Sequence, residues 1–234
     1  MSEPNRPEWE MTTDDYFRRM GLDPKSFEDA LHLPRVESVM RVLPLRDLKQ
    51  VDCLVPMHFD MLCYIVRRTR TLGGDLFAPD ANLHLSRMDS RQLKIGQKFV
   101  YRENYQGLIE EVPDIFSHFC VCSGLGDVGP HFAFGHDTNN CRAMACYLPP
   151  IIERLGPDYV IMDGIHRNYI AKQTGKPTNV IIVENVALPF PCSARDWIEI
   201  RVISLAEKPK DPNERYFDHK RELFRDLKYL GIDG

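Results

Sequence analysis

The sequence predicts an α/β protein of α+β layout, in which a small mixed sheet is flanked by helices. Residues 159–162 and 180–183 are short apolar runs on either side of a helical pattern over 165–174, which indicates strand, helix and strand with short connections. Residues 197–205 alternate between apolar and polar side chains, as a half-exposed strand does. A chain of 234 residues is also long enough to bury a substantial core.

The remaining elements follow from local patterns. Apolar spacing predicts a helix within 57–69, and Gly175 followed by Pro177 is typical of the end of the helix over 165–174. The other expected elements are a strand over 38–45 that ends at a proline, a strand over 98–101, an apolar run over 116–122, a short helix over 141–147, and a final helix that begins at Asp211-Pro212 with Tyr216, Leu223, Leu227 and Leu230 on one face.

Composition narrows the classes of partner. The net charge of −4 argues against a nucleic-acid partner, because no global basic field is present. No apolar run is long enough for a transmembrane helix, and the first seven residues lack the basic-then-apolar layout of a signal peptide. Seven cysteines without an export signal indicate reduced thiols. We therefore expect a cytoplasmic protein with no membrane partner.

Asp163-Gly164-Ile165-His166-Arg167 is the segment with the clearest chemistry. A helix N-terminus presents unpaired amide hydrogens and partial positive charge, so it attracts anions, and a glycine allows a ligand close to the backbone. His166 and Arg167 fall in the first turn, where cations oppose the helix dipole and a bound phosphate explains them. Asp163 is predicted to bind Mg²⁺ or to act as a base, and the alternative is that it only caps the helix.

The segment 159–175 resembles the Asp-Gly-x-His-Arg segment of the ParB/sulfiredoxin-like superfamily, which includes ParB N-terminal domains, sulfiredoxins and free-serine kinases. Residues 40–48 are similar to the opening strand of that superfamily and the Pro-Leu-x-x-Leu turn that follows it. The resemblance implies a single domain over 1–234, and it divides the chain into a core of 38–49 and 158–205, a large insertion over 50–157, an N-terminal helical extension over 1–37 and a C-terminal helix over 206–234.

The resemblance also implies a site. Members bind ATP or CTP with the phosphates at this turn, so Gly164, His166, Arg167 and Asn168 are expected to hold phosphates and Asp163 to serve the substrate or a metal. Ile165 stands where sulfiredoxins place their catalytic cysteine, and no helix-turn-helix domain follows as in ParB. The free-serine kinases match the motif best, although their catalytic glutamate has no assigned counterpart in this sequence.

Within the insertion, His131 to Asp137 follows a glycine-rich loop. One interpretation is a second half-site with His136 as a base and Asp137 as a metal ligand, and the alternative is a strand that ends in a turn containing aspartate. Glu103 is a further candidate general base. Four cysteines in this region either bind zinc or are simply buried, namely Cys120, Cys122, Cys141 and Cys146. Cys122 or Cys192 is the candidate for a reactive thiol.

These observations predict an enzyme that uses ATP or another nucleotide, with Mg²⁺, to transfer a phosphoryl group to a small molecule or a protein side chain. Such chemistry depends mainly on positioning and charge neutralisation, which a helix terminus with His and Arg supplies. The alternatives are a nucleotide-binding or nucleotide-sensing module without turnover, and a ParB-like nuclease, against which the acidic net charge counts.

Overall fold

The computed structural model describes residues 11–12, 41–72, 74–77, 81–110, 128–225 and 227. The chain divides into two compact units, and each is described by itself. The first contains the described residues up to Thr69 and those of Pro130–Leu148, and the second contains those of Arg70–Gly129 and Pro149–Arg225. The two segments expected to form one core therefore fall into different units, 38–49 in the first and 158–205 in the second. Most of the expected N-terminal extension, and residues 116–122, lie outside the described residues.

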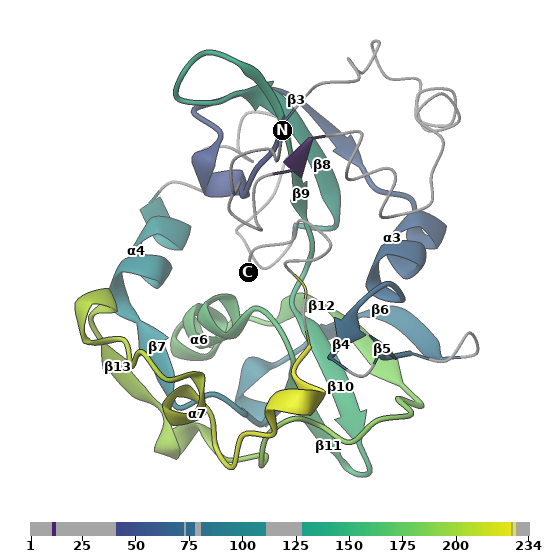
Figure 1. Ribbon diagram of the computed structural model, residues 1–234, viewed down its shortest axis with the longest axis vertical. Coiled ribbons are helices and arrows are strands. Elements are labelled where there is room, and N and C mark those ends of the chain that lie inside the picture. Colours follow the sequence, from purple (N-terminus) through teal and green to yellow (C-terminus); the bar gives the residue numbers. More distant parts are fainter. Residues whose placement is uncertain are drawn as a thin grey trace, which may run out of the picture. The chain divides into compact units, whose positions relative to one another are not determined.

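The first unit is built on a five-stranded sheet of order β1-β2-β9-β8-β3, in which only β2 and β9 run parallel. Figure 1 shows β3, β8 and β9 side by side. Its elements are β1 (Met11–Thr12), β2 (Arg41–Val42), β3 (Gln50–Pro56), α3 (Phe59–Val66), β8 (His131–His136) and β9 (Arg142–Tyr147). The helix predicted within 57–69 is confirmed as α3, which buries Leu62, Ile65 and Val66.

The helix predicted over 141–147 is wrong, because this segment is strand β9. Its residues pair along their whole length with β8, from His136↔Arg142 to His131↔Tyr147. Alanine and methionine favour a helix in isolation, but the ladder to β8 and the burial of Ala143 to Tyr147 outweigh that preference. The predicted strand over His131–His136 with an aspartate turn after it is confirmed.

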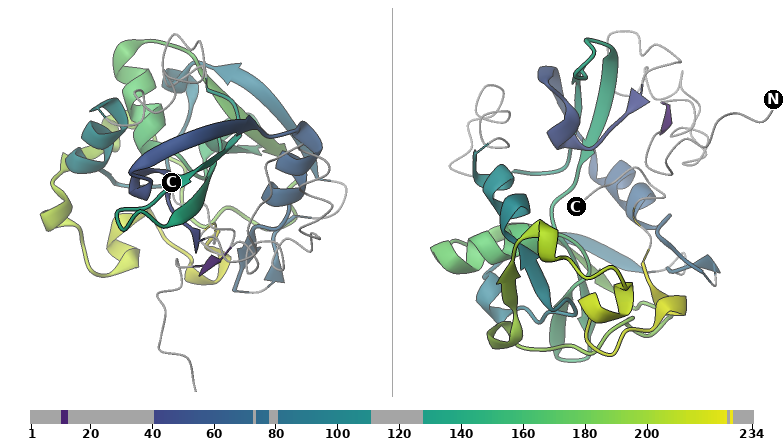
Figure 2. Two further views of the ribbon diagram at one scale, coloured as in Figure 1. Left: turned by 90° about the horizontal axis from the view of Figure 1, so that it is seen from above. Right: turned by 60° about the vertical axis from the view of Figure 1, so that its left-hand side comes forward.

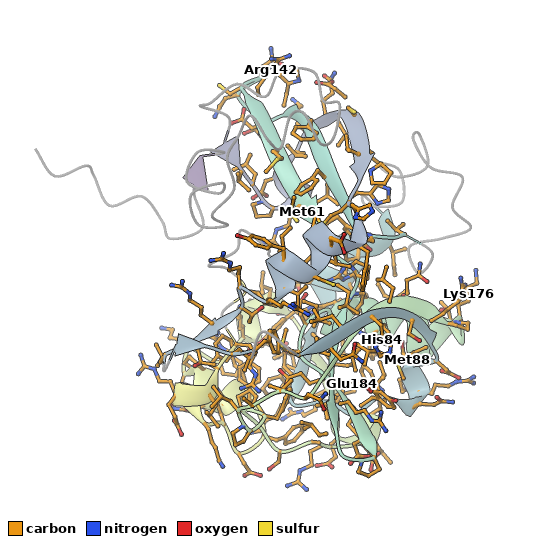
Figure 3. All side chains as sticks on the ribbon, turned by 90° about the vertical axis from the view of Figure 1, so that its right-hand side faces the viewer. Met61, His84, Met88, Arg142, Lys176 and Glu184 are labelled. Atoms are coloured by element: carbon orange, nitrogen blue, oxygen red, sulfur yellow. The ribbon has the colours of Figure 1, made fainter. Side chains whose placement is uncertain are left out.

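The second unit is built on a four-stranded sheet of order β11-β10-β12-β6. Its strands are β6 (Asn82–Met88), β10 (Ile151–Leu155), β11 (Asp158–Ile161) and β12 (Thr178–Glu184). Helix α6 (Ile165–Thr174) connects β11 to β12, as predicted, but β10 lies between the two strands, antiparallel to β11 and parallel to β12. β6 forms the outer edge, where Figure 3 shows His84 and Met88 along the strand and Glu184 of β12 beside it.

Both faces of this sheet bury apolar side chains. On one face, Ile165 of α6 packs with Ile152, Ile161 and Ile182 in a cluster that also contains Trp197. On the other face, the alternation of the strands buries the following side chains: Ile151, Glu153, Val160, Ile181 and Val183. Glu153 is thus a charged residue in the middle of a buried sheet face.

Shorter elements surround the sheet. β7 (Phe99–Tyr101) confirms the strand predicted over 98–101 and pairs in parallel with β13 (Arg201–Ile203). α4 (Arg102–Glu110) follows β7 and lies beside α6, as the right panel of Figure 2 shows. The predicted strand over 197–205 is shorter than expected, because Trp197–Glu199 is a 3₁₀ turn. β4 (Arg70–Thr71) and β5 (Gly74–Asp75) form a separate two-stranded ribbon.

The long helix predicted from Asp211 begins at that residue but ends after one turn. Asp211 accepts a hydrogen bond from the Asn213 amide, and α7 covers only Pro212–Arg215. The chain then turns extended at Tyr216, which forms a β-bridge with Gln97, and the Phe217 amide donates to the Gly96 carbonyl. Hydrogen bonds to the segment before β7 therefore replace the helical ones. No helix within the described part of the chain is long and apolar enough to span a bilayer.

Candidate functional site

The turn between β11 and α6 has the geometry that the sequence predicts. The amides of Met162 and Asp163 both donate to the Ile151 carbonyl, which fixes the chain as it leaves the sheet. Gly164 then occupies the N-cap position with φ of 81° and provides no side-chain cap for the helix. A Cβ at Gly164 would lie 2.7 Å from Cβ of Pro150. The positive φ and this close packing require glycine whether or not a ligand binds.

Asp163 and Arg167 form an ion pair across the first turn of α6. The guanidinium Nη2 lies 3.2 Å from Asp163 Oδ2, and the side chains are 9% and 14% exposed respectively. The carboxylate therefore supplies the counter-charge for a cation that would otherwise oppose the helix dipole. The two residues on which the predicted site most depends are in contact, and only a small part of each side chain is exposed.

His166 and Asn168 are held inside the unit. Nε2 of His166 accepts a hydrogen bond from the Tyr101 amide at 3.1 Å, which places the ring hydrogen of neutral His166 on Nδ1. Asn168 is fully buried, where its Oδ1 accepts from Ser90 Oγ at 2.8 Å and its Nδ2 donates to the Gly164 carbonyl at 3.1 Å. Both side chains, expected to contact phosphate, thus hold the α6 N-terminus in place.

Glu103 lies in the first turn of α4, in the same unit. Its Oε2 accepts a hydrogen bond from the Leu205 amide at 2.7 Å. This contact caps the 3₁₀ turn Leu205–Glu207 and accounts for the carboxylate without a role as a base.

The other predicted half-site belongs to the first unit. Nδ1 of His136 lies 3.0 Å from Oδ2 of Asp52, a partner on β3 that the sequence pattern did not indicate. Asp137 is buried, and its Oδ1 accepts the amides of Asn139 and Cys141 at 2.8 and 2.9 Å. The Asp137 carboxylate therefore closes the β8–β9 turn, as in the interpretation without a metal.

The cysteines give little support to metal or thiol chemistry. No group of three or more His, Cys, Asp or Glu side chains that could hold a metal occurs in the described ranges. Cys141 is exposed, Cys146 is buried, and both are free thiols, whereas Cys120 and Cys122 lie outside the described residues. Burial raises the pKa of Cys192 to about 12, which disfavours the thiolate form that a reactive cysteine requires.

Sequence reasoning missed the tyrosines beside this turn. The pKa of Tyr216 is raised to about 12, mainly by burial, with smaller increases from Cys192, Tyr101 and Asp163 and an opposing effect of Arg215. Tyr216 forms a β-bridge with Gln97, shortly before β7, and Tyr101 at the end of β7 contacts His166 in the first turn of α6. Only long-range pairing of the 215–217 segment with the segment before β7 brings them together, and no local pattern reveals it.

Comparison with protein-family models, with curated proteins and with solved structures found no match. The geometry of the α6 turn is therefore the basis for the proposal that follows.

Proposed function

We propose that the second unit binds the phosphates of ATP, or of another nucleotide, at the N-terminus of α6 and transfers a phosphoryl group to a small molecule or a protein side chain. The observation that carries the proposal is the Asp163–Arg167 pair at a helix N-terminus whose N-cap is a left-handed glycine. Helix amides, the dipole and a guanidinium are the groups that bind phosphate in proteins.

Ligand binding rearranges the ion pair in this proposal. A phosphate carries more negative charge than a carboxylate, so it competes with Asp163 for the Arg167 guanidinium, which lies 3.2 Å from Asp163. The released carboxylate would hold Mg²⁺, which neutralises charge on the transferred group. His166 and Asn168 act indirectly, because their hydrogen bonds to Tyr101 and Ser90 position the turn.

Replacing Asp163 by Asn tests the catalytic part of the proposal. An Asn oxygen can still accept from Arg167, so we expect the variant to fold, with a melting temperature lowered by a few degrees because the counter-charge for the guanidinium is lost. The variant loses the charge that holds Mg²⁺, so ADP formation from MgATP should fall by roughly a hundredfold, in line with the loss of one charge-stabilising group. The assay measures ADP release with water alone and with L-serine as the acceptor.

Asp196→Asn is the matched control, because Asp196 is a carboxylate of the same unit in an exposed pair with Lys94. It should leave ADP formation unchanged. Full activity in Asp163→Asn would refute the catalytic role of this carboxylate. A wild type that binds ATP but forms no ADP with either acceptor would instead favour a nucleotide-binding module without turnover.

A further inference from the structure

Tyr101, the last residue of β7, carries a buried polar atom for which the described part of the chain provides no partner. Its side chain is 3% exposed, and no hydrogen-bond partner for its phenol oxygen exists among the described residues. Buried hydroxyl groups in folded proteins almost always have a partner, because an unpaired one has lost its hydrogen bonds to water. An unpartnered donor in this place therefore needs an explanation.

Tyr101 is attached directly to the first turn of α6. Its backbone amide donates to Nε2 of His166, and the centroids of the two rings are 5.8 Å apart. The ammonium of Lys208 lies 5.2 Å from the centroid of the Tyr101 ring. The aromatic ring thus lies near both a first-turn side chain of α6 and an exposed cation.

The phenol of Tyr101 is in its un-ionised form. Burial raises the pKa of Tyr101, opposed by Arg215, so the hydroxyl keeps its hydrogen at neutral pH. Tyr101 is consequently a hydrogen-bond donor whose ring lies 5.8 Å from that of His166, in the first turn of α6.

We infer that the Tyr101 hydroxyl is a ligand-binding group of this site, donating its hydrogen to a phosphate oxygen of the ligand at the α6 N-terminus. The inference rests on the proposed function and extends it to a residue outside the Asp-Gly-x-His-Arg segment. A donor that is already removed from water gives up no hydrogen bond when the ligand arrives, so most of the new bond strengthens binding. Movement of the exposed Lys208 side chain, which covers the ring, would open the approach.

Tyr101→Phe removes the oxygen and keeps the ring. Because the oxygen has no partner among the residues that the structure describes, we expect the melting temperature of the ligand-free protein to stay the same or rise. The affinity for MgATP and for pyrophosphate should fall by roughly tenfold each, the effect of one hydrogen bond to a charged group. Calorimetry measures the affinities and thermal unfolding measures the stability.

Tyr159→Phe is the matched control, since Tyr159 is a partly buried tyrosine on β11 of the same unit, and it should leave both affinities unchanged. Wild-type affinity in Tyr101→Phe, with affinity lost in Arg167→Ala, would overturn the inference and leave the proposed function standing. A lowered melting temperature of Tyr101→Phe without ligand would also overturn it, because the hydroxyl would then serve the fold. A wild type that binds neither MgATP nor pyrophosphate would overturn both proposals.

Discussion

Replacing Arg225 by Met is expected to lower the free energy of unfolding by about 3–5 kcal/mol. Arg225 forms a two-bond pair with Glu153, with Nε and Nη2 lying 2.9 and 3.0 Å from the two carboxylate oxygens. The side chains are 3% and 0% exposed. Methionine fills a similar volume but leaves the Glu153 charge buried in the middle of the sheet without a counter-charge. Urea unfolding followed by circular dichroism measures the loss.

Two further variants separate charge burial from packing. Removing both charges, in Glu153→Met with Arg225→Met, should recover most of the stability, because an apolar pair leaves no buried charge. Arg154→Met is the surface control: Arg154 is the next residue on β10, its 2.7 Å pair with Glu184 is exposed, and its loss should cost about 1 kcal/mol or less. Equal stability of wild type and Arg225→Met would contradict this account of the β10 face.

Replacing Gly164 by Ala is expected to cost about 2–4 kcal/mol, from a left-handed backbone and from overpacking. The φ of 81° disfavours any side chain, and the new methyl would lie within 2.7–3.0 Å of three Pro150 atoms. The loss should appear in the ligand-free protein, because both causes belong to the fold. Chemical denaturation without nucleotide measures it.

Comparison with Gly175→Ala shows how much of the stability loss in Gly164→Ala comes from the clash with Pro150. Gly175 ends α6 with φ of 65°, and nothing lies within 4 Å of a Cβ built there. Only backbone strain remains, so we expect a loss of about 1 kcal/mol. Equal losses of stability in the two variants would show that Pro150 moves aside and that packing is not the reason why residue 164 is a glycine.

The local elements of the second unit were predictable because their signals lie within a few residues. Apolar runs, the Asp163-Gly164 turn and Gly175 fix the beginning and end of α6, which the structure confirms over Ile165–Thr174. The insertion of β10 between β11 and β12 was not predictable, since strand order depends on pairing between distant segments. For the same reason, the local sequence predicts a helix where strand β9 forms, and a helix after Asp211 that is longer than the observed α7.

The candidate site shows the same difference between what local sequence predicts and what depends on distant segments. Asp163 and Arg167 are four residues apart on one helix turn, so their proximity follows from helical geometry. The partners of His166 and Asn168 are Tyr101 and Ser90, more than sixty residues away, and they determine that these side chains face inward. The sequence pattern identifies which residue types gather at the turn, but only long-range contacts determine which of them remain available to a ligand.

Calorimetric titration of the wild type and Arg167→Ala with ATP, CTP, GTP and ADP, with and without Mg²⁺, tests the central claim most directly. Arg195→Ala, which removes an exposed arginine paired with Asp218, is the control for the lost charge. We predict that the wild type and the control bind at least one nucleotide, and that Arg167→Ala binds it at least about tenfold more weakly. No binding by the wild type, or equal binding by Arg167→Ala, would contradict a phosphate site at the α6 N-terminus.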